Sequence, residues 1–196
     1  MAGLASCGGA DNIYAPQADV DRVVYRHPGP PMITLFTMKN TGSDNGAHTG
    51  LMVNASQRVI FDPAGSWRLS FVPERYDVHY GITPQVEFAY MSAHARETYY
   101  VLRHDKEVSA EAAELCLQLV QRAGPVPKAA CTLATGRVLR QVPGFESIRP
   151  ALFPDRLMEQ FRALPGVVES MLREHDSDDK ELAIAEFEAQ MRAQGL

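Results

Sequence analysis

Five short runs rich in β-branched and aromatic residues lie in the first half of the chain, and they constrain its fold more than any other feature. Each run is bounded by Gly, Pro, Asn or Asp, which is the pattern of strands that end in turns. The predicted strands cover residues 32–40, 48–54, 58–62, 85–91 and 98–103. Because short connections suit antiparallel rather than parallel neighbours, we expect antiparallel pairing.

The register between the second and third predicted strands depends on the loop that joins them. A loop of residues 55–57 places Asn54 opposite Arg58. A loop that starts one residue earlier places His48 directly opposite Asp62. Since a shift of one residue turns the side chains of a strand to the other face, the two registers build different sites. The sequence leaves both registers open.

Helices are expected after residue 108. Ser109 is a suitable N-cap for a helix whose apolar residues recur at the spacing of one helical face, and Gly124 with Pro125 ends that helix. Cys116 lies within this apolar stripe, so we expect it to fill the core. Further helices are expected at 131–142, after Pro154–Asp155 and from Asp178 to Gly195. Strands followed by helices predict an α+β fold, with a small antiparallel sheet packed against helices.

Composition and charge exclude several classes of protein. The 196 residues are 45% apolar and 22% charged, which suits one well-buried domain. A net charge of −5 argues against a nucleic-acid partner, which would need a basic face. The excess negative charge lies within residues 169–192, so the rest of the chain is close to neutral. No apolar run is long enough to cross a bilayer as a helix.

The spacing of ligand-type residues predicts neither a metal site nor a cofactor. The six histidines are scattered, without a His-x3-His pair, and no two cysteines are close in sequence. The sequence has no glycine-rich phosphate loop after a strand and no Gly-x-Ser-x-Gly motif. Nucleotide-dependent enzymes and serine hydrolases are therefore not expected.

The N-terminal residues Leu4, Ala5, Ser6 and Cys7 resemble the lipobox of bacterial lipoproteins, in which a signal peptidase cuts before the cysteine and the new terminus is diacylated. The basic and apolar segment that normally precedes a lipobox is largely missing ahead of Leu4. The polar, proline-containing residues 8–31 suit a tether to a folded domain. The resemblance implies a lipid anchor on Cys7; the alternative is a stray thiol in a disordered N-terminus.

The lipobox changes the expected state of the other cysteines. If Cys7 carries lipid, Cys116 and Cys131 remain, and in an oxidising periplasm they can either form a disulfide or stay reduced. The sequence does not decide between the two states. A catalytic role for Cys131 requires the reduced state.

Cys131 lies at the predicted start of a helix, after the extended segment 124–130. A helix N-terminus offers unpaired N–H groups and the positive end of the helix dipole, and both favour a thiolate. The same N–H groups can stabilise the oxyanion of a tetrahedral intermediate. A thiolate nucleophile needs a base, which His48 can supply, and Asp62 can fix the orientation of the imidazole. The residues therefore predict a triad of Cys131, His48 and Asp62.

The order of these elements resembles the circularly permuted NlpC-type branch of the papain-like cysteine hydrolases, whose relatives include cell-wall peptidases and the lecithin:retinol acyltransferase group. The resemblance covers roughly residues 32–145 and rests on a histidine on one strand, a polar residue on the next, an edge of the type "YYVLR", a helix, and a cysteine heading another helix. It implies a papain-like core with Cys131 as nucleophile, His48 as base and Asp62 as the orienting residue. Peptidoglycan stem peptide is the implied substrate.

Each of these residues also has an ordinary structural interpretation. Cys131 shares a helical stripe with apolar residues and can be a buried, inert thiol. Asp62 precedes Pro63 and can initiate a turn, in which case Asn54 or a backbone carbonyl would have to hold the His48 ring. Three further histidines are rival bases expected in loops or at the surface, namely His79, His94 and His104.

The expected organisation has three parts: a lipobox and tether at 1–31, a papain-like domain at 32–165, and an acidic amphipathic C-terminal helix at 166–196. One expected function is a thiol hydrolase of the bacterial envelope, on the periplasmic side, that cleaves an amide or ester. The alternative is a non-catalytic lipoprotein that binds a protein partner through the same fold and the C-terminal helix. That helix has an apolar side, which can dock onto another subunit or pack on its own domain. This side comprises Ile184, Phe187 and Met191.

Overall fold

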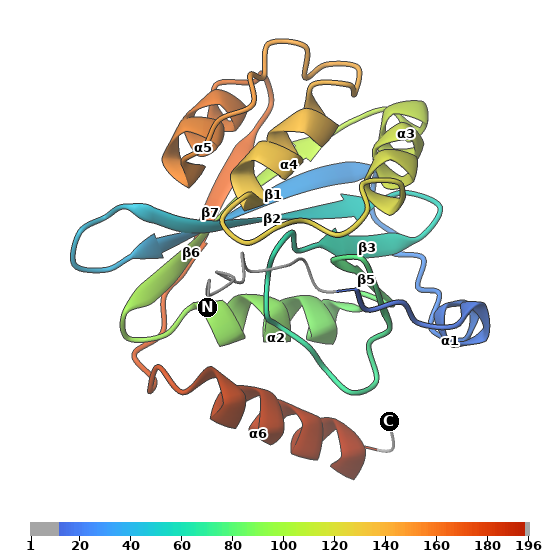
Figure 1. Ribbon diagram of the computed structural model, residues 1–196, viewed down its shortest axis with the longest axis vertical. Coiled ribbons are helices and arrows are strands. Elements are labelled where there is room, and N and C mark those ends of the chain that lie inside the picture. The colour runs from blue at the N-terminus through green and yellow to red at the C-terminus, as the bar shows by residue number, and fades with distance from the viewer. Residues whose placement is uncertain (1–11, 195–196) are drawn as a thin grey trace, which may run out of the picture.

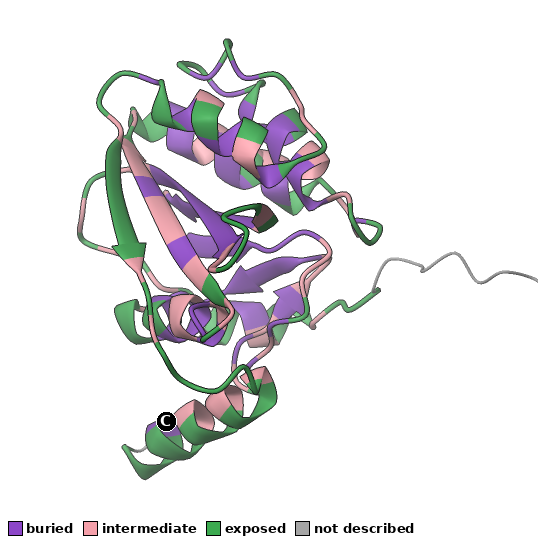
Figure 2. Cartoon of the chain, turned by 90° about the vertical axis from the view of Figure 1, so that its left-hand side faces the viewer, coloured by how far each residue is buried: buried purple, intermediate pink, exposed green. Residues whose placement is uncertain are grey.

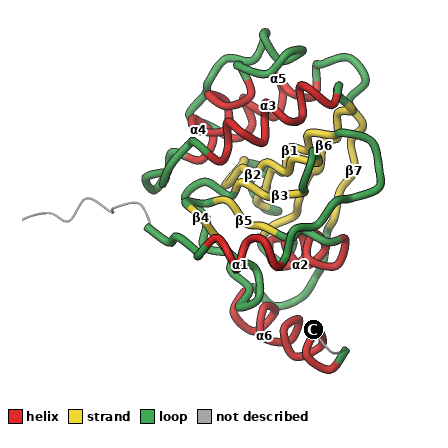
Figure 3. Tube along the Cα trace, turned by 90° about the vertical axis from the view of Figure 1, so that its right-hand side faces the viewer, coloured by secondary structure: helices red, strands yellow, loops and turns green. Residues whose placement is uncertain are grey.

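In the computed structural model, which describes residues 12–194, four of the five predicted strand runs lie in one antiparallel sheet. The strands of the described residues are β1 (Met32–Asn40), β2 (Gly46–Asn54), β3 (Arg58–Phe61), β4 (Glu74–Arg75), β5 (Val78–Tyr80), β6 (Tyr99–Glu107) and β7 (Val168–Leu172). Their order across the sheet is β4-β5-β3-β2-β1-β6-β7 (Figures 1 and 3). The expected α+β class, with an antiparallel sheet packed against helices, is confirmed.

Helices cover both faces of this sheet. The helices of the described residues are α1 (Gln17–Arg22), α2 (Pro84–His94), α3 (Ala110–Gln121), α4 (Cys131–Leu139), α5 (Pro154–Arg162) and α6 (Lys180–Ala193). Helices α3, α4 and α5 lie on one face, α2 lies on the other, and α6 lies beyond α2 (Figures 1 and 3). Within residues 12–194, every helix is too short or too polar to span a bilayer.

The central strands are buried on both faces, which explains why their sequences are almost continuously apolar. Alternate residues of β2 enter two separate clusters of the core. Leu51 and Val53 pack beneath α3, α4 and α5, whereas Met52 packs with Trp67 and Tyr90 on the α2 side. Figure 2 shows buried residues along the sheet and on the helix faces turned toward it, while α6 carries mostly intermediate and exposed residues.

The segment 85–91, which the sequence predicts as a strand, is helical, so that prediction is wrong. Helix α2 begins at Pro84, directly after Thr83, whose hydroxyl accepts a hydrogen bond from the Val86 N–H. A threonine cap followed by proline is a signal for the start of a helix. The strand prediction gave more weight to the aromatic and β-branched composition of the segment. The buried apolar residues recur at helical spacing. They are Val86, Ala89, Tyr90 and Ala93.

Strands β2 and β3 pair in the register that a loop of residues 55–57 gives. Leu51 is opposite Phe61, where β3 ends. The alternative register, with His48 directly opposite Asp62, is therefore wrong. Residues 46–50 of β2 extend beyond the end of β3 and have no partner in that strand. Another element can therefore contact β2 on that side.

Residues 12–31 pack against the sheet, although we expected them to be part of a tether. Helix α1 buries Val20 in the core. The Tyr25 carbonyl accepts a hydrogen bond of 2.8 Å from the backbone N–H of Arg58 at the start of β3. These residues therefore belong to the folded domain. Cys7 and the rest of the expected lipobox lie outside the described residues.

After residue 165 the chain adds a strand before it forms the C-terminal helix. Strand β7 pairs with β6, so the expected boundary at 165 does not separate the C-terminal part from the sheet. Helix α6 follows, and the Asp179 carboxylate caps it by accepting a backbone hydrogen bond from its first turn. Ile184 and Phe187 pack against the cluster around α2. The apolar side of α6 thus lies on its own domain.

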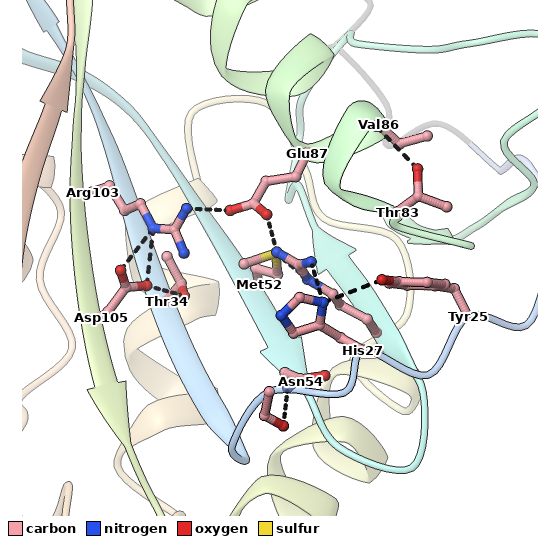
Figure 4. Close-up of polar contacts among 12 residues, drawn as sticks. Tyr25, His27, Thr34, Met52, Asn54, Thr83, Val86, Glu87, Arg103 and Asp105 are labelled. Atoms are coloured by element: carbon pink, nitrogen blue, oxygen red, sulfur yellow. Dashed lines mark hydrogen bonds and ion pairs between the residues drawn. The ribbon is translucent and has the colours of Figure 1, made fainter.

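A buried network of charged side chains joins α2 to the sheet (Figure 4). Glu87 of α2 binds Arg58 of β3 and Arg103 of β6. Arg103 also donates to Asp105 over 2.8 Å, and Asp105 accepts a bond of 2.6 Å from the Thr34 hydroxyl of β1. Each buried charge has an opposite partner, as burial requires. The network therefore fixes α2 over three strands of the sheet.

Candidate active site

Cys131 is the first residue of α4. The chain enters this helix through Ala129, whose φ of 64° is a left-handed conformation that turns the backbone sharply. No described side chain caps the helix, so the first-turn N–H groups have no side-chain partner. These groups and the helix dipole place partial positive charge around the sulfur, which favours the thiolate.

Helix α4 packs against β2, and one of their contacts, between Thr132 and Thr49, lies beyond the residues of β2 that pair with β3. The backbone of Thr49 on β2 is one of the groups that lower the pKa of the Cys131 thiol. The Thr49 hydroxyl lies 3.4 Å from the hydroxyl of Thr132, which itself lies 3.7 Å from the sulfur. Two buried threonines, one from each element, therefore hold the thiol beside the strand that carries His48.

His48 Nε2 donates to Asp62 Oδ1 over 2.7 Å. The two residues are diagonal neighbours, because continuing the register of β2 and β3 would put Gly50 opposite Asp62. The Tyr90 hydroxyl uses the space that Gly50 leaves, since a Cβ there would clash with it. Tyr90 donates to the same Asp62 oxygen over 2.7 Å. The Asp62 side chain therefore points into the site instead of capping the turn that follows it.

The electrostatics of the three predicted residues are coupled. Burial alone would lower the pKa of His48, but Asp62 and the contact with Cys131 outweigh burial and raise the pKa to about 10. Burial would raise the pKa of the Cys131 thiol, yet His48, Thr132 and the Thr49 backbone together lower it. Burial would also raise the pKa of Asp62, and the His48 charge lowers it instead. The arrangement therefore shifts each of the three groups toward its charged form: thiolate, imidazolium and carboxylate.

Two of the three rival histidines contact residues other than Cys131, His48 and Asp62. His104 of β6 donates to Glu169 of β7 over 2.8 Å. His79 of β5 is buried against Trp67, with ring centres 5.2 Å apart, and burial lowers its pKa. Both are therefore built into the sheet and its core, rather than placed in loops as expected.

The third rival, His94, lies beside the candidate site. Its ring is stacked on that of His48, with centres 6.1 Å apart and planes inclined by 19°. Its Nδ1 donates to the Tyr90 carbonyl over 2.7 Å, and burial lowers its pKa to about 3. His94 is thus a neutral ring and a poor base. Sequence reasoning missed this role because the spacing of Tyr90 and His94 puts them on one face only if their segment is a helix.

A cavity of about 460 Å³ opens beside the stacked histidines. Strands β1 and β2, the loop of residues 64–66, the end of α2 and the start of α6 form its walls. Cys131 does not line the cavity, and only 8% of that residue is exposed. A ligand in the cavity therefore meets the His48 ring directly, and it reaches the sulfur only through the small exposed part of Cys131.

Cys116 and Cys131 are both free thiols. Cys116 lies on the buried face of α3 in the core, where burial raises its pKa, so the expected core role is confirmed. In the described part of the chain, no three His, Cys, Asp or Glu side chains are grouped as a metal site requires.

The chain matches no family model, no curated protein and no solved structure. Its function must therefore be inferred from the geometry and chemistry of the site.

Proposed function

We propose that the protein is a cysteine hydrolase of the papain-like, permuted NlpC type, with Cys131 as nucleophile, His48 as base and Asp62 as the orienting residue. The observation that carries the proposal is the meeting of three groups from three elements. They are a free thiol at a helix start, an imidazole on β2 and a fully buried carboxylate after β3. A thiolate–imidazolium pair held by a carboxylate is the arrangement that thiol hydrolysis needs.

Two further features support the family. The three residues follow one another in the order His, Asp, Cys along the chain. An antiparallel sheet carries the histidine, and the helix headed by Cys131 packs against it. By the same proposal, a lipid on Cys7 anchors the protein on the periplasmic side of a bacterial membrane. The substrate is an amide or ester, with peptidoglycan stem peptide as the family-implied example.

Acylation of Cys131 is the first half of the proposed reaction. The thiolate attacks the substrate carbonyl carbon, a C–S bond forms, and the carbonyl oxygen becomes an oxyanion. The N–H groups in the first turn of α4, which no described side chain caps, stabilise that oxyanion in the proposed mechanism. Since Asp62 holds Nε2 of His48, Nδ1 is the nitrogen that protonates the leaving amine or alcohol. The C–N or C–O bond then breaks and leaves a thioester on Cys131.

Hydrolysis of the thioester is the second half. The now neutral His48 takes a proton from a water molecule, and the resulting hydroxide attacks the thioester carbonyl. Collapse of the second tetrahedral intermediate breaks the C–S bond, releases the carboxylic acid and returns the thiolate–imidazolium pair. Asp62 stays ionised throughout, because its oxygen accepts hydrogen bonds from both His48 and Tyr90.

The pH dependence of alkylation tests the proposal. In the full chain, iodoacetamide should label Cys131 rapidly at about pH 6, because the thiolate is present there. His48→Gln should confine labelling to above about pH 8, where an ordinary thiol ionises. Peptide mapping reads each cysteine separately, and buried Cys116 should stay unlabelled in the same sample. Wild-type labelling only above about pH 8 would overturn the proposal.

A second measurement separates the hydrolase from a non-catalytic lipoprotein. Stem peptides and simple carboxylic esters are incubated with the protein, and the reaction is quenched with acid. The mass of the proteolytic peptide that contains Cys131 is then measured by mass spectrometry. A hydrolase should carry an acyl group on that peptide and release acid, and Cys131→Ala should do neither. Fast alkylation without any acyl adduct or product would favour the partner-binding alternative.

A further inference from the structure

Lys180, the first residue of α6, brings a positive charge into the cavity beside His48. Its ammonium donates to Nε2 of His94 over 3.1 Å. Because Nδ1 of His94 donates to the Tyr90 carbonyl, Nε2 is the unprotonated nitrogen and can accept this bond. The neutral ring therefore positions Lys180 without neutralising its charge.

The other charged groups of the cavity wall already have partners. Arg96 lies 3.8 Å from the carboxylate of Glu174. Asp178 accepts a hydrogen bond of 2.9 Å from the Thr98 N–H. Among the described residues, no carboxylate lies within ion-pair distance of Lys180, whose one hydrogen bond goes to the neutral His94. Lys180 is thus a half-buried cation in the cavity, and the nearest negative charge that acts on it, Asp62, is beyond ion-pair distance.

This state of Lys180 is unfavourable without a ligand. Burial lowers the pKa of Lys180, since a desolvated ammonium lacks full compensation. An ammonium has three N–H donors, and only one of them is used by His94. A carboxylate in the cavity would accept from the remaining donors in charge-assisted hydrogen bonds and would supply the missing charge.

On the premise of the proposed hydrolase function, we propose that Lys180 binds a carboxylate of the substrate. The enzyme would then select amides or esters that carry a carboxylate close to the carbonyl that Cys131 attacks. The stacked rings of His48 and His94 lie between the Lys180 ammonium and the Cys131 sulfur. Their width therefore sets the distance between the carboxylate and the attacked carbonyl of the substrate. Because Lys180 belongs to α6, this selectivity comes from the C-terminal segment.

Two alkylating agents that differ in charge test the site without a known substrate. Iodoacetate is a carboxylate and iodoacetamide is neutral, and both react with the same sulfur. The two rates at Cys131 are measured in the full chain at about pH 6 by peptide mapping. Lys180→Met should lower the iodoacetate rate about tenfold more than the iodoacetamide rate, as expected for loss of a charge-assisted hydrogen bond.

Matched variants keep the result specific to the charge of Lys180. Lys180→Gln retains a donor for His94 but not the charge, so the iodoacetate rate should fall relative to the iodoacetamide rate. Lys180→Arg retains the charge and should keep the wild-type ratio of the two rates. Lys106→Met is the control, because Lys106 binds the Pro165 carbonyl and does not line the cavity. It should leave the ratio of the two rates as in the wild type. Labelling of Cys116 reports any variant that has unfolded.

The outcomes distinguish the carboxylate site from the underlying hydrolase. The carboxylate site is overturned if iodoacetamide alkylates Cys131 rapidly but the ratio of the iodoacetate rate to the iodoacetamide rate is the same in the wild type and in Lys180→Gln. That result leaves the proposed hydrolase intact. Alkylation by iodoacetamide only above about pH 8 overturns the proposed function itself. Loss of the preference in Lys180→Gln together with its retention in Lys180→Arg supports the site.

Discussion

Gly50 allows a diagonal pair of residues to meet across the end of β3. A side chain at this position would stand between β2 and Asp62, and it would clash with the Tyr90 hydroxyl. Without one, Tyr90 and His48 can both reach Asp62 Oδ1, each over 2.7 Å. The geometry of the candidate triad thus depends on a residue that contributes no functional group.

Gly50→Ala should disturb this geometry through Tyr90. The added methyl group must displace the Tyr90 hydroxyl, so we expect the free energy of unfolding to fall by about 1–3 kcal/mol, as for an overpacked core. Alkylation of Cys131 at about pH 6 should slow as well. The double variant Gly50→Ala with Tyr90→Phe removes the clashing hydroxyl and should cost less than the sum of the single changes. Additive losses in urea unfolding would contradict this account.

The raised pKa of His48 makes stability depend on pH. Its folded-state pKa of about 10 lies above the ordinary value of 6.5. The stabilisation is therefore complete below about pH 6.5 and is lost as the pH rises through about 10. Burial opposes this shift and Asp62 is the main group that outweighs it, so Asp62→Asn should abolish the loss of stability between these values.

The measurement is the free energy of unfolding in urea across this pH range. Both chains should carry Cys131→Ser, because the lowered pKa of the Cys131 thiol contributes with the opposite sign. We expect the chain with Asp62 to lose more than about 1 kcal/mol relative to Asp62→Asn. Parallel curves for the two chains would show that Asp62 does not set the charge of His48.

At the scale of elements, helix α2 shows which information a local pattern lacks. The segment 85–91 has the composition of a strand, and only the Thr83 cap and the spacing of the buried residues mark it as a helix. In contrast, β1 was predicted at its observed bounds, because a strand buried on both faces has a continuous apolar run between turn residues. Composition therefore located the central strands β3, β2, β1 and β6, but it missed β4, β5 and β7 at the edges and the helix packed on the sheet.

Glu87 links α2 to the sheet, and its removal tests that link. Glu87→Gln leaves the buried Arg58 without its carboxylate, and it removes one of the two carboxylates that the half-buried Arg103 binds. We expect the free energy of unfolding in urea to fall by about 3–5 kcal/mol, as for a broken buried ion pair. The matched control Glu159→Gln breaks an exposed pair with Arg156 and should cost less than about 1 kcal/mol. Equal losses for the two variants would mean that the buried network is not a stabilising link.

At the scale of the whole molecule, the candidate site combines segments that no local pattern connects. Cys131 was predicted because a helix start is visible in the sequence, and the pairing of His48 with Asp62 was predicted from triad logic with the register left open. Lys180 could not be predicted, because it reaches the cavity only after β7 has returned the chain to the sheet. Long-range placement, not residue type, was the missing information.

The same architecture predicts an uneven distribution of stability, which hydrogen exchange can measure. Strand β1 lies in the centre of the sheet between β2 and β6 and is buried over most of its length. Helix α6 buries only Met191 fully and contacts the domain mainly through α2. Amides of α6 should therefore exchange before those of β1, because opening α6 exposes little apolar surface. Exchange of α6 and β1 at equal rates would indicate a single cooperative unit. Early opening of α6 would withdraw Lys180 from the cavity while leaving His48 and Cys131 in place, so the proposed carboxylate site could be lost without loss of the thiolate.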